Sequence, residues 1–289
     1  MNVRIFSTRK RPFHLGPFPS EKLVRAEEAV DLSNVPKMKP VSFTLQAAPE
    51  SLVNAMADYQ AMLDAIRDGL INKEIGNCPE DLQERARHIK SFAYFQDAPM
   101  AGIGRFDKTM LLDEPIHNPE IDRLAKELKY KQTKTLASGI DVIMADLKES
   151  MDAPPRTIDT HTHTVALLYD YHRDPTIDEP GYDWITDAQP QRASLLGAET
   201  AIIIAGYLRV LGYDAKAHTC SSSDVDLNKL AVSTGLASVE NGKLVNPFVG
   251  SRFQISAVTT NFEMYTDKPL APLEDCLLYT SDAADDANC

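Results

Sequence analysis

The 289-residue sequence contains four cysteines, and their positions exclude two kinds of site. Cys276 and Cys289 lie close to the carboxyl end, so only Cys78 and Cys220 remain in the body of the chain. Two isolated cysteines cannot supply the four thiolates of an iron–sulfur cluster or of an all-cysteine zinc site. They also cannot build a disulfide framework, so we expect a reducing compartment.

The sequence also lacks a basic surface and a membrane segment. Lys and Arg number 30 against 42 Asp and Glu, and the net charge of −12 would repel the phosphates of a nucleic acid. The basic start, residues 1–16, is not followed by an apolar segment of signal-peptide length. No run reaches the roughly 18 apolar residues of a membrane-spanning helix. We therefore predict a cytoplasmic protein whose partners include neither nucleic acid nor membrane.

The last segment, residues 276–289, lacks the periodicity of the rest. It follows the proline-containing stretch DKPLAPLED, shows no helical or strand period, and is small and acidic. The run CLLYTSDAADD resembles a translated sequencing adapter, so we expect this tail to be non-native and the native sequence to end near Asp275. Without its three aspartates the net charge is −9. A natural flexible acidic tail is the alternative.

What remains alternates helix and strand signals without a strict βαβ rhythm, and it is long enough to bury a sizeable core. Residues 1–48 are rich in proline and are predicted to form an extended arm. An α+β module is predicted over residues 49–275. The run TVALLY, residues 164–169, is typical of a buried strand, and the apolar stretch 189–211 predicts the most buried helix.

Four further helices are predicted before these two elements. The first covers residues 51–68, and others begin near Pro79 and at the Asn118-Pro119 cap. The apolar positions of the first helix fall on one predicted face: Leu52, Met56, Tyr59, Leu63 and Ile66. The last of the four carries the apolar positions Leu136, Ile140, Ile143 and Leu147.

The stretch from Glu199 to Phe262 is the most informative part of the sequence. A long apolar helix is followed by a short strand (YDAKAHT), a serine loop, a capped helix (DVDLNKLAVSTG), a Gly/Asn/Pro loop (ENGKLVNPFVGSRF) and an apolar strand (QISAVTT). Polar groups therefore gather in loops between apolar elements, as they do where a scaffold presents a binding site. In the order of its elements and in its sequence motifs, this stretch resembles the cobalamin-dependent, iron–sulfur reductive dehalogenases of the long catabolic type, and the related epoxyqueuosine reductase.

The resemblance implies a nitroreductase-like, cobalamin-binding module with a mixed sheet flanked by helices. In the intact protein it implies an oxidoreductase in which iron–sulfur clusters pass electrons to cobalamin and a carbon–halogen bond is reduced. A small halogenated organic molecule would be the substrate, and a reductase or ferredoxin the electron donor. The family's doubled motif Cys-x-x-Cys-x-x-Cys-x-x-x-Cys-Pro is absent from this sequence. The clusters are therefore expected in a downstream part, or this block is the amino-terminal copy of the core, and the chain alone is expected to be inactive.

The resemblance also suggests site residues. Those expected near cobalamin lie in the serine loop and the Gly/Asn/Pro loop: His218, Ser221, Ser222, Ser223, Asn246, Gly250 and Arg252. Tyr169 and Tyr171 are candidates for the proton-donating tyrosine, with Lys216 as the cation that would lower the pKa of the phenol. The same residues are also compatible with ordinary helix caps, turns and core aromatics.

Two other interpretations remain open. The chain could be a non-catalytic structural copy of the core module. It could also be a metal-dependent hydrolase, because IDTHTH places His161 and His163 two residues apart, as on one face of a strand that shares a metal ion. Such a site needs further ligands, and a hydrogen-bonded histidine pair without metal is favoured. A Cys220–His218 nucleophile pair is compatible with the spacing but not favoured.

Overall fold

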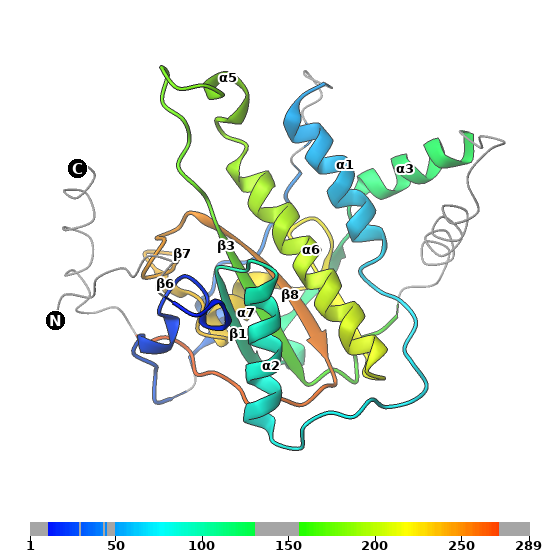
Figure 1. The fold of residues 1–289 in the computed structure, drawn as a ribbon, viewed down its shortest axis with the longest axis vertical. Helices are drawn as coiled ribbons and strands as arrows, with labels where there is room; N and C mark the ends of the chain where they lie inside the picture. Colours follow the sequence, from blue (N-terminus) through cyan, green and yellow to red (C-terminus); the bar gives the residue numbers. More distant parts are fainter. Residues whose placement is uncertain (1–10, 29, 43, 45–49, 131–155, 272–289) are drawn as a thin grey trace.

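The computed structural model describes residues 11–28, 30–42, 44, 50–130 and 156–271. Its centre is a four-stranded sheet (Figure 1) in the order β1 (Met100–Arg105), β3 (His163–Asp170), β8 (Phe253–Thr260) and β4 (Ala215–His218). With helices on both faces, this confirms the predicted α+β class. The expected mixed sheet is wrong, because all three pairings are antiparallel. The crossover from β3 to β4 leaves these two strands running in the same direction, but β8 lies between them and opposes both.

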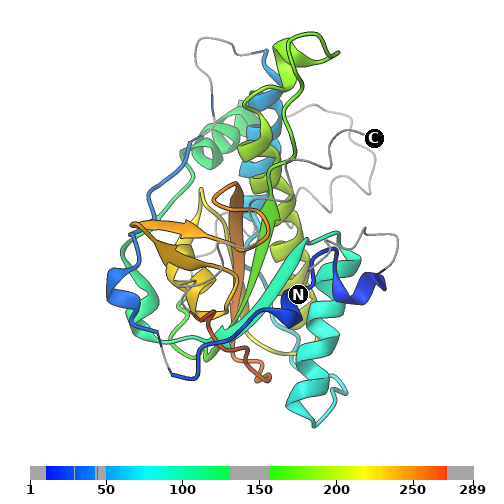
Figure 2. The same cartoon turned by 90° about the vertical axis from the view of Figure 1, so that its left-hand side faces the viewer.

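Helices cover the two faces of the sheet. On one face lie α2 (Leu82–Phe95) and α6 (Gln189–Val210), and α1 (Leu52–Ala65) packs along α6 with α3 (Pro119–Tyr130) against it. The other face carries α7 (Leu227–Ser233) and the hairpin of β6 (Ser238–Glu240) and β7 (Lys243–Val245), as Figure 2 shows. The shorter elements are the paired strands β2 (Leu111–Ile116) and β5 (Ser223–Val225), the helix α5 (Tyr182–Ile185) and the 3-10 helices η2 (Phe13–Leu15), η3 (Ser20–Lys22), η4 (Leu32–Asn34) and η5 (Lys108–Met110).

The strand β3 shows why the core forms here. Val165, Leu167 and Tyr169 belong to the apolar cluster beneath α6, whereas Ala166 and Leu168 belong to the cluster beneath α7. Because successive side chains point to opposite faces, a strand covered on both sides must be apolar throughout. The predicted strand in TVALLY is therefore confirmed.

The apolar face predicted for the first helix is only partly packed, with Leu63 and Ile66 against the core beneath α6. Leu52 and Tyr59 are exposed, the latter by 64%. The buried face instead carries Ala57, Gln60, Ala61 and Asp64. The reason is tertiary: this face of α1 packs against polar loop residues and α6, so polar side chains find hydrogen-bond partners inside.

The helix α6 confirms the prediction of a long buried helix over residues 189–211. Thirteen of its residues are buried, among them Ile204 and Leu208, which lie in the core beneath it. Ile203 is only partly buried, so the stretch is not enclosed on every side. By length and composition α6 could span a membrane, but most of it is buried within the protein.

The proline-rich residues 11–42 lie against the module at several points. Arg25 donates a hydrogen bond of 2.7 Å to the carbonyl of Gly235. Further along, the Asn228 side-chain amide donates to the carbonyl of Pro36 at 2.8 Å, and the backbone N–H of Met38 donates to Asp226. The predicted non-native tail and the predicted helix at 136–147 lie outside the described residues.

Candidate functional site

The polar side chains predicted from the serine loop are enclosed in the protein. His218 ends β4, Ser223 begins β5, and the loop between them is hydrogen-bonded to side chains of α1 and α6. Every residue from His218 to Ser223 is buried, and Ser221, the most exposed, shows only 8% of its surface. The loop therefore forms a polar interior rather than an open surface.

Asp64 of α1 is the centre of the first part of this interior. Its carboxylate accepts hydrogen bonds from Ser221 at 2.6 Å, Thr219 at 2.7 Å and Asn118 at 2.8 Å. Burial raises the pKa of Asp64, and these three hydrogen bonds partly oppose that rise. Asn118 also caps α3 through the N–H of Glu120, so the same side chain ties two helices to the loop.

Gln60, one turn before Asp64, extends the network to α6. Its amide nitrogen donates to Ser221 at 3.0 Å, and its oxygen accepts from Gln191 and Ser194. The Ser194 hydroxyl lies 2.9 Å from the thiol of Cys220. Burial raises the pKa of Cys220 to about 12, so the thiol stays protonated and is a poor nucleophile.

A compact ionic cluster surrounds Asp224 of β5. Its carboxylate lies 2.6 Å from Arg67, 3.0 Å from Lys216 and 3.6 Å from the Nδ1 atom of His218. Burial alone would raise the pKa of Asp224, but the adjacent Arg67 guanidinium and the other charges outweigh it and hold the pKa well below its usual value. Asp224 therefore carries its negative charge between two buried cations.

Two histidines meet at one hydroxyl. The Oγ1 atom of Thr259 lies 2.8 Å from Nε2 of His218 and 2.8 Å from Nδ1 of His161. His161 also lies 3.5 Å from Asp214, which pairs with Arg156 at 3.1 Å. Burial holds the pKa of His218 well below its ordinary value, so this ring is neutral.

The structure gives no support to the metal-dependent hydrolase. His161 belongs to the hydrogen-bonded chain through Thr259, whereas the ring of His163 bonds to the hydroxyl of its neighbour Thr162. Within the described ranges, no three His, Cys, Asp or Glu side chains come together as a metal site. The Nδ1 atom of each histidine instead takes part in a hydrogen bond to a threonine hydroxyl.

The catalytic candidates lie apart from one another. The Tyr169 hydroxyl bonds to Thr200 at 2.7 Å and to the carbonyl of Gln96, and burial raises its pKa to about 12. Lys216 instead pairs with Asp224. The structure does not place the lysine beside this phenol.

Tyr171 has a different environment from Tyr169. Its hydroxyl accepts a hydrogen bond of 2.9 Å from Gln254, and the Arg252 guanidinium lies 5.7 Å from the centre of its ring. Burial raises the pKa of Tyr171 despite the nearby positive charge. Neither tyrosine therefore has the lowered pKa of a readily donating phenol.

The remaining cofactor candidates form a turn and a surface. Asn246 is buried, donates to the carbonyl of Leu236 at 2.7 Å and accepts from the N–H groups of Phe248 and Val249. Gly250 has a positive φ of 61°, as the tight turn back to Asn246 requires. Arg252 is on the surface, near Asp174 and the carbonyl of His172.

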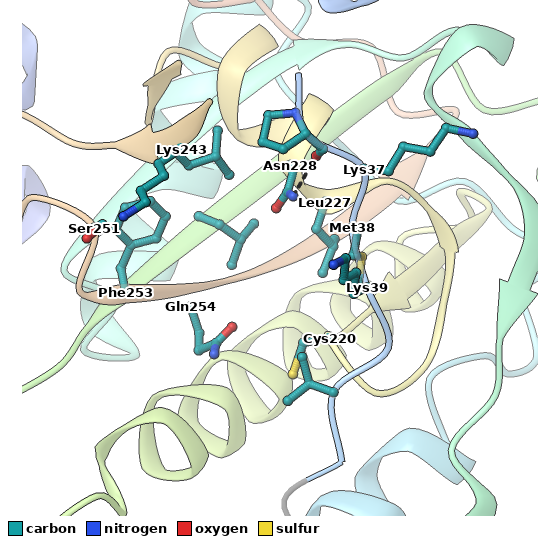
Figure 3. A pocket seen from close by; sticks show the side chains of 14 residues that line it. Lys37, Met38, Lys39, Cys220, Leu227, Asn228, Lys243, Ser251, Phe253 and Gln254 are labelled. Atoms are coloured by element: carbon teal, nitrogen blue, oxygen red, sulfur yellow. Dashed lines mark hydrogen bonds between the residues drawn. The ribbon is translucent and has the colours of Figure 1, made fainter. Parts of the chain in front are cut away.

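A cavity of about 410 Å³ lies next to the buried loop (Figure 3). Cys220 lines it at the lower edge of the view, and residues of the arm between Pro36 and Val41 line it as well. Of the residues predicted to contact cobalamin, none lines it.

These residues do not fit a corrin cofactor. The volume of the cavity lies at the lower end of the range for drug-sized ligands, about 300–1,000 Å³, whereas cobalamin with its nucleotide tail is larger than such ligands. His218 and Ser221 to Ser223 are covered by the protein, and all but Ser222 direct side-chain polar atoms to protein partners. The Oγ atom of Ser222 is buried with no hydrogen-bond partner among the described residues.

Sequence reasoning missed the residues that organise this interior. Three polar residues about one helical turn apart contact the loop and β5. They are Gln60 and Asp64 of α1 and Arg67, which follows the helix. In the sequence these residues form a polar face with helical spacing, opposite the apolar face of the same helix. A polar face of this kind is ordinarily exposed to solvent, so the pattern did not predict burial.

Comparison with known proteins gave matches among solved structures. No protein-family model and no curated protein matches the chain. The catabolic reductive dehalogenase NpRdhA is 31% identical, with a TM-score of 0.66, over 93% of this chain and 32% of that one. A second structure of it, in complex with 3-bromo-4-hydroxybenzoic acid, is 30% identical with a TM-score of 0.65. This chain therefore spans about a third of the length of these dehalogenase structures.

Two further solved structures are similar to this chain. A reductive dehalogenase structure described as suggesting a mechanism for B12-dependent dehalogenation is 30% identical over the same shares of both chains. Epoxyqueuosine reductase from Streptococcus thermophilus is 14% identical, with a TM-score of 0.36, over 65% of this chain and 49% of that one. The expected resemblance to reductive dehalogenases is confirmed, while the likeness to epoxyqueuosine reductase is too weak to support an argument.

Proposed function

We propose that this chain is one module of a larger reductive dehalogenase-like oxidoreductase, and that the cofactor chemistry takes place outside it. The observation that carries the proposal is the 31% identity with NpRdhA over 93% of this chain, at a TM-score of 0.66. Because the match covers only 32% of that protein, the module corresponds to a part of it. The whole protein would be cytoplasmic, would reduce a small halogenated aromatic compound and would receive electrons from a reductase or ferredoxin.

The packing around the serine loop supports a non-catalytic role for this module. The residues that would approach a corrin ring are already bonded to Asp64, Asp224 and Thr259. The two described cysteines, Cys78 and Cys220, cannot ligate an iron–sulfur cluster. When bound in the larger protein, cobalamin and the clusters would supply the electron transfer and carbon–halogen cleavage, and the residues described here would hold the module's shape.

The outer face of α1 also supports a role within a larger protein. Leu52, Tyr59 and Met62 are exposed, and their spacing places them on one side of the helix. An apolar stripe of this kind is typical of a surface that another part of the protein covers. We propose that the remainder of the larger protein covers it.

Two measurements test the proposal separately. Titration of the purified chain with hydroxocobalamin, followed by visible absorbance and calorimetry, should show no stoichiometric binding. Stoichiometric binding that is weakened by Arg252→Gln, a surface change that leaves the core intact, would overturn the non-catalytic role. The reading frame of the native gene should contain two Cys-x-x-Cys-x-x-Cys-x-x-x-Cys-Pro motifs beyond this module, and their absence would overturn the link to the family.

The role of the exposed stripe on α1 is tested by comparing this chain with the larger protein. Tyr59→Ser and Met62→Ser should leave the unfolding midpoint of this chain nearly unchanged, because both side chains are exposed in it. In the larger protein the same changes should lower the midpoint by several degrees. Equal effects in both would show that the stripe is not an internal contact.

A further inference from the structure

The cavity beside Cys220 combines an apolar interior with positive charge at its rim. Leu227, Phe253 and Ile255 line it and are almost fully buried. Residues of the arm between Pro36 and Val41 also line it, as do the hairpin residues Lys243 and Leu244. Figure 3 shows Lys39 and Lys243 on different sides of the cavity. We infer that this cavity binds a small organic anion that has a flat or compact apolar body.

The charges that line the cavity are all of one sign. Lys37, Lys39 and Lys243 contribute to its wall, and no Asp or Glu among the described residues does. The chain as a whole carries a net charge of −12, so a cavity with only positive charges departs strongly from the rest of the protein. Such a cavity concentrates anions, because low-dielectric walls focus the field of the lysines into it.

The three lysines are not equivalent. The ammonium of Lys37 lies 2.9 Å from Asp113, and Figure 3 shows its side chain directed away from the cavity. No ion pair or hydrogen bond engages the ammonium groups of Lys39 and Lys243 among the parts of the chain that the structure describes. These two, on different sides of the cavity, are therefore the cations that an anionic ligand would meet.

The apolar residues that line the cavity indicate that the ligand also has an apolar part. A free inorganic anion would gain nothing from Leu227, Phe253 and Ile255, whereas an apolar body buried there gains about 25 cal/mol for each Å² removed from water. The volume of about 410 Å³ accommodates one or two fused rings. Of the polar side chains, Gln254 is held by Tyr171 and Asn228 by the carbonyl of Pro36, so both are fixed before any ligand arrives.

The experiment uses the full chain and naphthalene-2-carboxylate as the anion. Binding is followed by calorimetry and by protein NMR at low and at physiological salt, with naphthalene-2-methanol as the uncharged analogue of similar shape. We expect saturable binding of the carboxylate at one site, weaker binding of the alcohol, and a loss of affinity as salt is raised.

Variants locate the site. Lys39→Gln and Lys243→Gln should each weaken carboxylate binding about two- to fivefold, as loss of one partly exposed ionic contact does. Lys37→Gln is the matched control and should leave the affinity unchanged, because its ammonium is paired with Asp113. Leu244→Trp should remove binding by filling the cavity, with unchanged far-UV circular dichroism as evidence of folding.

Three outcomes would overturn the inference. These are no saturable binding of the carboxylate, equal binding of carboxylate and alcohol, or an affinity that the double variant of Lys39 and Lys243 does not change. None of these results bears on whether the chain is part of a reductive dehalogenase, since that proposal depends on the cluster motifs and on cobalamin.

Discussion

The apolar core beneath α6 and the polar interior beside α1 are both closed to solvent, yet their stability has different origins. Beneath α6, Leu167, Ile204, Leu208 and Val258 pack with little freedom and no hydrogen-bond partners to satisfy. Beside α1, Asp64 and Asp224 each contact three polar side chains, whose burial is tolerated because they meet these carboxylates. An apolar core loses stability in proportion to the volume removed, whereas a buried polar network fails when a single partner is lost.

The comparison also bears on function. A cluster of serines, histidines and carboxylates is commonly taken as a mark of a site, but here the cluster's own members use up almost all of its bonding capacity. The cavity beside Cys220 shows the reverse: within the described part of the chain the ammonium groups of Lys39 and Lys243 have no ion-pair partner, and apolar side chains line the cavity. Charged groups without a protein partner, next to a cavity, are therefore the feature from which we infer binding in this module.

The largest effect should come from breaking the ionic cluster. Asp224→Asn removes the anion between Arg67 and Lys216, whose side chains are only 14% and 3% exposed. Because two buried cations then lack a counter-charge, the free energy of unfolding should fall by about 3–5 kcal/mol. Urea denaturation measures it.

Asp113→Asn is the matched control for that measurement. It removes the partner of Lys37 in an ion pair whose side chains are 78% and 88% exposed, so no measurable change is expected. If Asp224→Asn were as mild as this control, the polar interior would not depend on its charges.

The apolar core should respond next. Leu208→Ala removes a fully buried side chain and should lower the free energy of unfolding by about 2–4 kcal/mol through lost burial and a residual cavity. Val210→Ala, two residues later on α6 and 66% exposed, should change it by less than about 0.5 kcal/mol. A large effect at Val210 would mean that α6 has a further buried contact.

Sequence reasoning performed differently in these two regions. The strand at 164–169 and the helix at 189–211 could be predicted, because covering both faces of an element forces a continuous apolar run. The buried face of α1 could not be predicted from its periodicity. Gln60 and Asp64 become suitable interior residues only once Thr219, Ser221 and Ser194 are brought to them by the fold.

The site residues show a similar limit. Small hydroxyls at Ser221 to Ser223 suit close approach to a flat ligand, and they suit internal hydrogen bonds equally well. Sequence alone does not distinguish the two uses, because the partners of Ser221 come from residues about 160 positions away. The cavity's lysines lie on the arm and on the β6–β7 hairpin, and only the fold places them together.

The histidines give the polar interior a pH dependence that the apolar core lacks. Burial holds the pKa of His218 well below its ordinary value, and burial also lowers the pKa of His163. Below about pH 6.5 the unfolded chain therefore binds protons that the folded chain does not. The free energy of unfolding consequently decreases as the pH is lowered, by up to about 1.4 kcal/mol per pH unit for each such histidine. The pKa of Asp224 is lowered instead, and its stabilising contribution is lost only in more acidic solution.

Denaturation between pH 7 and 5 measures this slope. His218→Gln should reduce it, because the group facing Asp224, Lys216 and Thr259 no longer titrates. His117→Gln, whose parent side chain is 60% exposed, should leave it unchanged. An unaltered slope in His218→Gln would assign the pH dependence to another group.

The smallest effect distinguishes two adjacent serines of the same loop. Ser221 donates to Asp64 and accepts from Gln60, so Ser221→Ala should lower the free energy of unfolding by about 1–3 kcal/mol and leave a buried carboxylate short of a donor. Ser222 is buried even more completely, but its Oγ atom has no partner within the described chain. Ser222→Ala should therefore cause no loss and could raise stability by up to about 1 kcal/mol, because an unsatisfied hydroxyl is removed from the interior. Chemical denaturation of the two variants side by side measures the difference. If Ser222→Ala proved as damaging as Ser221→Ala, the Ser222 hydroxyl would have a bonded partner in solution, and the polar interior would extend beyond the network described here.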